Sequence, residues 1–202
     1  MTTTNKQVAE ALEKIKGKYP KEEEQNLVAI LTDVIEHGKS LKDALKYTPE
    51  MLEEIYAIAQ RNFASGNYKE ASLLFNVLIS LDDSQARYYM GAGACAHMQK
   101  RYKDAVTYYQ VCSHLDSDDP LPAYHAADCY MHLDDPGSAY KSITLAFLQS
   151  GNNPKYRQIK ERASLMQNKI LNDVKRDVDN VVLALKEGVK AAKIEADLEK
   201  GA

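Results

Sequence analysis

The sequence of 202 residues predicts an all-α protein built from repeated helical hairpins. Small residues recur every 34 residues, where a longer side chain would hold two crossing helices apart. They are Ala59, Gly93 and Ala127 in the first helix of each unit, and Ala71, Ala105 and Ala139 in the second. Bulky residues recur at the same interval, among them Tyr68 and Tyr102, Phe75 and Tyr109, and Leu81 and Leu115. We therefore expect three hairpins in a right-handed superhelix, with an N-terminal amphipathic helix and a C-terminal capping and extended helix.

This spacing resembles the tetratricopeptide repeat, whose unit is a helix, a tight turn and a second helix. The repeats are assigned to residues 52–153, as 52–85, 86–119 and 120–153. The pattern departs from the usual one at Asn62, where an aromatic residue is expected, and at Lys100 and Asp134, where a turn glycine is common. Pro136 replaces a tyrosine in the third repeat, which predicts a helix with Asp135 as its N-cap and Pro136 at its first position. Ser40 and Thr48 are expected to cap earlier helices, and the linker LDDS is expected to supply an Asp or Ser cap for the second repeat.

The region before the repeats is divided into a mobile segment, residues 1–21, and a helix with its connector, residues 22–51. Apolar residues at helical spacing, acids in the first turn and His37-Gly38 at the end predict this amphipathic helix. Its stripe either caps the superhelix or forms a homodimer with a second copy. The candidate dimerisation residues are Leu27, Leu31, Val34 and Ile35.

The region after the repeats, residues 154–202, is expected to begin with a capping helix at Asn153-Pro154. A charged helical extension follows, with apolar residues at alternating spacings of three and four. It can project into solvent, pack back or self-associate, and the sequence leaves these alternatives open. The stripe consists of Leu171, Val174, Val178, Val181 and Leu185.

Composition excludes several classes of partner. A formal net charge of −3 and a pI near 6.0 disfavour nucleic acid, which normally requires a concentrated basic face. The sequence contains no run of 18 apolar residues and no N-terminal secretory core or lipidation signal, so we expect no stable membrane insertion. Cys95, Cys112 and Cys129 occupy small-residue positions of the repeats, which predicts buried thiols in a reducing cytosol.

Sequence motifs give no indication of an enzyme. There is no nucleophile–base pattern, no phosphate-binding glycine loop and no Cys-x-x-Cys pair, and no cofactor is expected. His125, Asp128, Cys129 and His132 have a spacing that could place them on one helix face, as a zinc site would require. Because Cys129 falls at a repeat-interior position, we predict no metal site.

The candidate binding surface is the concave face lined by the first helix of each repeat. Aromatic and Met side chains in such a groove suit an extended peptide with alternating apolar anchors, although single members can instead complete the core. An acidic tail would meet too few Lys and Arg residues here to offset its desolvation. The predicted lining consists of Tyr56, Gln60, Phe63, Arg87, Met90, Ala94, His97, Leu121, Tyr124, Asp128 and Met131.

Three runs resemble the class II chaperones of type III secretion: LEEIYAIAQRNFASGNYKEA (52–71), ARYYMGAGAC (86–95) and DPLPAYHAADC (119–129). SLKDALKYTPEML (40–52) precedes them in register. The resemblance covers about residues 22–170 and implies a non-enzymatic chaperone in the bacterial cytoplasm that cradles an extended segment of a hydrophobic translocator and often dimerises through its N-terminal helix.

Carried over by position, the resemblance implies groove roles for Tyr56, Phe63, Met90, His97, Tyr124 and His125. Gln60 departs from a commonly aromatic position, and the tail after about residue 172 is longer than the family implies. The rival interpretation is a repeat scaffold that joins two folded partners. A scaffold's partners are soluble alone, whereas a chaperone's client is not.

Overall fold

A computed structural model describes residues 17, 18 and 20–200, with the side chains of the last helix described to Lys186. Within these residues the chain forms nine α-helices, one 3-10 turn and no strand, which confirms the all-α prediction. The predicted mobile segment, residues 1–21, lies almost wholly outside the described part. The chain divides into two compact units, Met1–Leu115 and Asp116–Ala202, each described below on its own.

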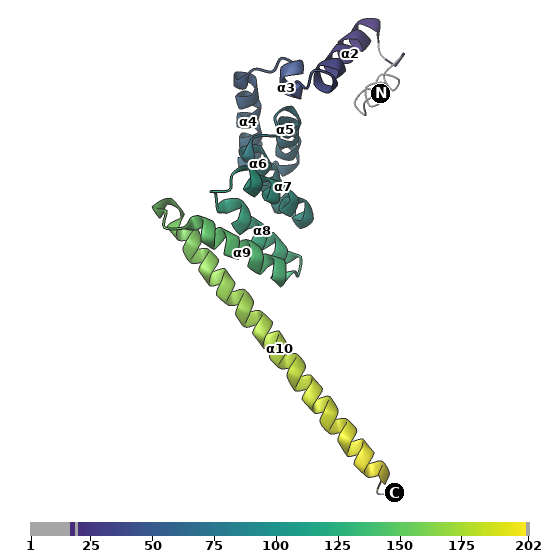
Figure 1. Cartoon of the computed structure of the whole chain (residues 1–202), viewed down its shortest axis with the longest axis vertical. Coiled ribbons are helices and arrows are strands. Elements are labelled where there is room, and N and C mark those ends of the chain that lie inside the picture. Colours follow the sequence, from purple (N-terminus) through teal and green to yellow (C-terminus); the bar gives the residue numbers. More distant parts are fainter. Residues whose placement is uncertain (1–16, 19, 201–202) are drawn as a thin grey trace. The chain divides into compact units, whose positions relative to one another are not determined.

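The first unit contains two of the three hairpins, preceded by two helices (Figure 1). Its elements are α2 (Lys21–Ile35), α3 (Leu41–Ala44), α4 (Pro49–Ala64), α5 (Tyr68–Leu81), α6 (Ala86–Met98) and α7 (Tyr102–Leu115). The second unit contains the third hairpin and the C-terminal helix. Its elements are α8 (Leu121–His132), α9 (Pro136–Ser150), the 3-10 turn η1 (Pro154–Tyr156) and α10 (Arg157–Lys200).

Small residues lie at the helix crossings, as the 34-residue period predicts. The five alanines of this set, Ala59, Ala71, Ala105, Ala127 and Ala139, are all 0% exposed. Gly93 is also buried, and a Cβ added to it would lie 2.7 Å from Cε1 of Tyr109 on α7. Close approach of the two helices of a hairpin therefore depends on the absence of side-chain atoms at these positions.

The three hairpin turns share one backbone conformation despite their different residues. Gly66, Lys100 and Asp134 have φ values of 80°, 60° and 55°, in the left-handed region. Main-chain hydrogen bonds close each turn; in the second, the N–H of Arg101 donates to the carbonyl of Ala96 at 2.9 Å. Lys100 and Asp134 thus take the conformation that glycine usually supplies.

Helix caps are only partly as predicted. Ser40, Thr48 and Asp135 accept hydrogen bonds from backbone N–H groups in the first turns of α3, α4 and α9. The prediction of an Asp or Ser cap for the second repeat is wrong, because Gln85 occupies the N-cap of α6 without a side-chain bond. Asp82 instead ends α5 and binds a neighbouring helix.

The Asp82 carboxylate connects α3 to the first hairpin. Its side chain is 9% exposed and accepts hydrogen bonds from Lys42 Nζ at 2.7 Å, from the Ser84 hydroxyl at 2.6 Å and from the Ser84 N–H at 3.2 Å. Burial opposes ionisation of this carboxyl, but the bonds from Lys42 and Ser84 outweigh it and lower its pKa to about 2. Leu41 and Tyr47 add apolar packing against the first core.

α10 caps the second unit and then continues. Ala163 and Ile170 on α10 are 0% and 2% exposed and belong to the core formed with α8 and α9. The backbone helix runs on through Gly188 to Lys200. In the described part of the chain, no helix combines the length and apolar character needed to cross a bilayer.

Candidate functional site

In the first unit, the predicted lining residues lie on α4 and α6, the first helices, or A helices, of their hairpins. We call the surface that these residues form the first A-helix face. Five of its members are half-buried, whereas Gln60 and Arg87 are exposed. The face consists of Tyr56, Gln60 and Phe63 on α4, and Arg87, Met90, Ala94 and His97 on α6. Half-buried aromatic and thioether groups can contact a ligand while the core holds their inner sides.

Tyr56 is the centre of this face. Its ring meets Phe75 edge-on at a centroid distance of 6.0 Å and lies tilted against Tyr88 at 5.7 Å. Its hydroxyl accepts a hydrogen bond from Gln60 Nε2 at 2.7 Å. Because Phe75 and Tyr88 are 2% and 1% exposed, the core fixes the Tyr56 ring from beneath.

Arg87 lies over the Tyr56 ring. Its guanidinium carbon is 4.6 Å from the Tyr56 ring centroid and 5.2 Å from that of Tyr88. Arg87 Nη2 is also 2.8 Å from Glu53 Oε2, so this cation already has an anionic partner. The neutralised pair agrees with the prediction that this face does not bind acidic tails.

Further along the face, aromatic neighbours fix two more members. Phe63 packs edge-on against Tyr68 at 5.3 Å. The His97 ring lies edge-on to Tyr102 at 5.7 Å and to Tyr109 at 6.3 Å. Both rings therefore rest on the second helix of their own hairpin, with their positions set by packing.

In the second unit, the lining residues lie on α8, which we call the second A-helix face. All five are half-buried, and Tyr124 and Met131 pack against the second core as well. This agrees with the expectation that single members also complete the core. The members are Leu121, Tyr124, His125, Asp128 and Met131, and the rings of Tyr124 and His125 lie 5.6 Å apart.

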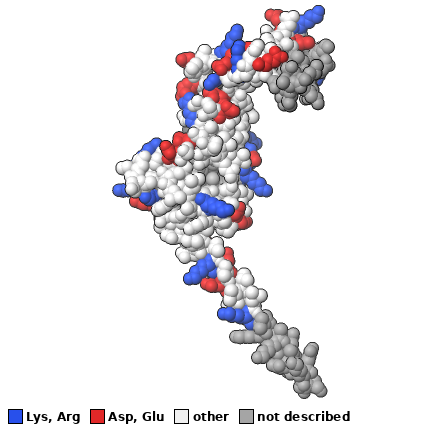
Figure 2. All heavy atoms as spheres, viewed as in Figure 1, with Lys and Arg blue, Asp and Glu red and all other residues white. Residues whose placement is uncertain are grey.

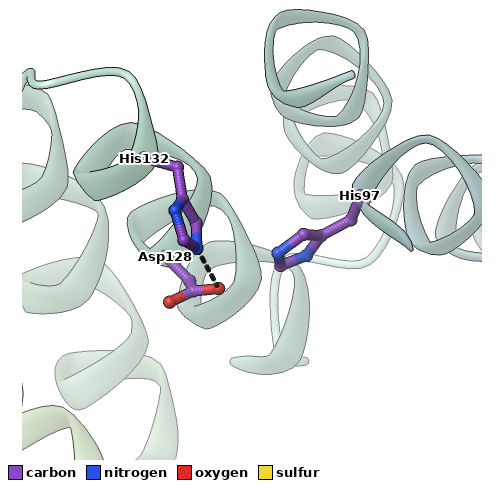
Figure 3. A group of neighbouring side chains, drawn as sticks. All are labelled: His97, Asp128 and His132. Atoms are coloured by element: carbon purple, nitrogen blue, oxygen red, sulfur yellow. Dashed lines mark ion pairs between the residues drawn. The ribbon is translucent and has the colours of Figure 1, made fainter. Parts of the chain in front are cut away.

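Burial separates Cys129 from Asp128 and His132 among the four residues considered for zinc. Asp128 and His132 lie one turn apart on α8, with Oδ2 and Nε2 separated by 4.0 Å (Figure 3), and their side chains are 46% and 51% exposed. Cys129 is 0% exposed and faces the protein interior. Burial raises the pKa of the Cys129 thiol to about 12, so the thiolate that zinc requires is disfavoured.

Cys95 and Cys112 are also buried thiols. Burial raises the pKa of Cys95 to about 11, and Cys112 donates a hydrogen bond to the Ala86 carbonyl at 3.3 Å. The prediction that the cysteines act as small core residues is confirmed.

Two residues that shape the first A-helix face were missed by the sequence analysis. Tyr88 supports both Tyr56 and Arg87, and Glu53 pairs with Arg87. Glu53 and Arg87 are one repeat apart, so opposite charges at the repeat spacing were an available signal. Tyr88 has no such counterpart, since Glu54 and Pro122 stand one repeat away.

Charge is distributed unevenly over the visible surface (Figure 2). Acidic and basic side chains intermingle over α2 to α4, whereas the surface of the later hairpins turned to the viewer shows fewer charged side chains. A face lined by half-buried aromatic side chains suits apolar polypeptide better than a polyanion. Hairpin repeats that present such faces define a class of non-enzymatic, protein-binding modules.

Comparison with known proteins indicates which members of this class the chain is similar to. No family model matches the chain. The low calcium response locus protein H of Yersinia pseudotuberculosis is 28% identical over 117 residues, which cover 58% of this chain and 70% of that protein. The structure of PcrH with the chaperone-binding region of PopD has 27% identity and a TM-score of 0.61, covering 62% of this chain and 95% of that chain.

A further solved structure is the Yersinia enterocolitica type III secretion translocator chaperone SycD, in a form described as an alternative dimer. It has 28% identity and a TM-score of 0.60, and covers 62% of this chain and 96% of that chain. The chain is thus related to the tetratricopeptide-like translocator chaperones of type III secretion, which confirms the resemblance seen in its sequence.

Proposed function

We propose that this protein is a chaperone that holds an extended, apolar segment of a secreted translocator against its A-helix faces and keeps it soluble until secretion. The observation that carries the proposal is the recurrence of large half-buried side chains at the repeat spacing. One position is occupied by Tyr56, Met90 and Tyr124, and a second by Phe63, His97 and Met131.

The distribution of these residues over successive hairpins favours an extended client. Each hairpin presents its own pair of anchors, and an extended chain can place successive apolar side chains on successive anchors. The complex of PcrH with the chaperone-binding region of PopD supports a peptide ligand for this fold. We also propose a bacterial cytoplasmic location, because a translocator must be bound before it is exported.

The stripe on α2 is proposed as a homodimer surface. Leu27, Leu31, Val34 and Ile35 are all half-buried, and no residue of α2 is fully buried within the described chain. An amphipathic helix with an incompletely covered apolar side needs a partner. The dimeric form described for SycD supports a second copy in that role.

Titration of a fluorescent translocator peptide tests the binding face. Tyr56→Ala and Met90→Ala on the first face, and Tyr124→Ala on the second, should each weaken binding, by about 2 kcal/mol or thirtyfold for an aromatic anchor. Leu73→Ala is the matched control, because Leu73 is 69% exposed on α5, outside both faces. Circular dichroism verifies that each variant keeps its helicity.

Two outcomes contradict the proposal. Full affinity in all three anchor variants would place the client elsewhere on the molecule. A partner that stays soluble when expressed without this protein would favour a scaffold over a chaperone, so co-expression with neighbouring open reading frames accompanies the titration.

A further inference from the structure

The middle of α10 carries an apolar seam that the described chain leaves uncovered. Ala163 and Ile170 bury the same side of the helix against the second core. Beyond Ile170, apolar residues continue along this side of the helix at helical spacing. They are 42% to 59% exposed up to Val181, and Leu185 is 64% exposed. The α10 seam consists of Leu171, Val174, Val178, Val181 and Leu185.

The spacing of the α10 seam specifies a partner helix. Successive members are three, four, three and four residues apart, which is the 3.5-residue period of a coiled coil. On a straight α-helix of 3.6 residues per turn, a seam with a seven-residue repeat shifts gradually around the helix surface. A strict seven-residue repeat therefore implies two helices that wind around each other.

A second copy of the chain can cover the α10 seam completely. In heptad positions, Leu171, Val178 and Leu185 are a residues, whereas Val174 and Val181 are d residues. Parallel helices match a with a and d with d, so all five layers form. Antiparallel helices match a with d and can therefore use at most four of the five.

Charges beside the seam permit the parallel alignment. Asp177 would face Val182 of the second copy, and the residue at the position opposite Lys175 is Ile170, which its own core buries, so no like charges meet. An antiparallel pair that joins Val174 to Val178 would bring Lys175 near Lys175 of the other copy.

The segment from Leu171 to Lys186 gives little support to a membrane as the partner. It contains three basic and three acidic residues, and Figure 2 shows both signs along the described part of α10. A neutral helix gains no attraction to anionic lipid.

We propose that residues 171–185 of α10 form a parallel, in-register coiled coil with the same segment of a second copy. The pairing is independent of client binding, because it uses no residue of either A-helix face. Two heptads hold helices together weakly, so the pair dissociates on dilution unless other contacts join the copies.

Disulfide trapping in the full chain tests the proposal directly. Val174→Cys and Val181→Cys are separate variants, and each places one thiol per chain at a d position. Each should give a covalent dimer through identical residues under mild oxidation. Asp179→Cys is the matched control, because it lies at a b position, directed away from the partner; it should trap at least fivefold less dimer. The native thiols do not interfere, since Cys95, Cys112 and Cys129 are 0% to 3% exposed.

Sedimentation over a concentration series gives an independent measurement. Val178→Glu with Val181→Glu should raise the dimer dissociation constant at least tenfold, whereas Asn172→Glu with Asn180→Glu, on the outer side of the same helix, should not. Equal trapping at Val181→Cys and Asp179→Cys, or an unchanged dissociation constant, would overturn the proposal. Loss of client affinity with unaltered self-association would assign the seam to the client and overturn it equally.

Discussion

Gly91 and Gly93 lie two residues apart on α6 and contact different neighbours. A Cβ on Gly93 would press on Tyr109 within the same hairpin, whereas one on Gly91 would overlap the Phe75 ring on α5 of the preceding hairpin. Both glycines allow a buried aromatic ring to lie directly on the α6 backbone. One position therefore sets the spacing within a hairpin, and the other sets the spacing between hairpins.

Leucine at these two positions should destabilise the first unit. Overpacking costs about 1–3 kcal/mol or more, which exceeds the helix-propensity gain of roughly 1 kcal/mol on replacing glycine. Gly137→Leu is the matched control, because the nearest atom to its added Cβ is Asp135 Oδ1 at an ordinary 3.6 Å. In thermal melts followed by circular dichroism, Gly91→Leu and Gly93→Leu should lower the midpoint and Gly137→Leu should not. An unchanged midpoint for Gly93→Leu would contradict the crossing assignment.

The packing roles of residues that recur at the 34-residue period could be predicted from the sequence. The roles of residues without counterparts at that period could not. Gly93 has counterparts at Ala59 and Ala127, so periodicity identified it. Gly91 corresponds to Ala57 and His125, and its contact with Phe75 becomes visible only when α5 and α6 are packed. The same limit explains why Tyr88 was missed at the candidate site.

At the scale of elements, the ion pair between Lys42 and Asp82 attaches the short helix α3 to the C-terminal end of α5. The folded state holds the pKa of Asp82 near 2, against an ordinary value of 3.8. A lowered carboxyl pKa stabilises the fold fully above the unfolded value, and the stabilisation disappears as the pH falls toward the folded value. The sensitive interval for this group therefore runs from about pH 4 down to about pH 2.

Removal of the Asp82 charge should change the acid profile. Urea unfolding between pH 6 and pH 2 should show that Asp82→Asn is less stable at neutral pH but loses roughly 2 kcal/mol less over the acid interval than the parent chain. Asp83→Asn, at the exposed neighbouring position, serves as the control and should keep the parent slope. Parallel profiles for Asp82→Asn and the parent would contradict a stabilising role for this pair.

Element positions were predictable where helix signals were local. The caps at Ser40, Thr48 and Asp135 and the start of η1 after Asn153, which leads into α10, could be read from neighbouring residues. The cap of α6 was predicted wrongly because Asp82 is recruited by Lys42, 40 residues earlier in the chain. A tertiary partner thus overrode a local preference.

At the scale of the whole molecule, the α2 stripe is expected to join two copies. Leu31→Glu with Ile35→Glu should raise the dimer dissociation constant at least tenfold in sedimentation, because charge would be buried at the interface. Gln25→Glu with Ala29→Glu adds the same charge to exposed positions of the same helix and should have no effect. A lower melting temperature with unchanged association would instead identify the stripe as an intramolecular cap.

The composition of the A-helix faces was predictable, but their internal contacts were not. The repeat spacing assigned Tyr56, Arg87 and Tyr124 to these faces without knowledge of what each touches. The stacking of Arg87 on Tyr56 and its pairing with Glu53 depend on side-chain conformations that only the packed helices fix.

The hairpin turns have a consequence for how such proteins diverge. Main-chain hydrogen bonds hold the left-handed residue in each turn, and a residue other than glycine there costs on the order of 1 kcal/mol. The second and third turns accept that cost with Lys100 and Asp134 in place of glycine, whereas all three hairpins keep small residues at their crossings. Repeats of this kind are therefore better detected in distant sequences by their small crossing residues than by a glycine signature.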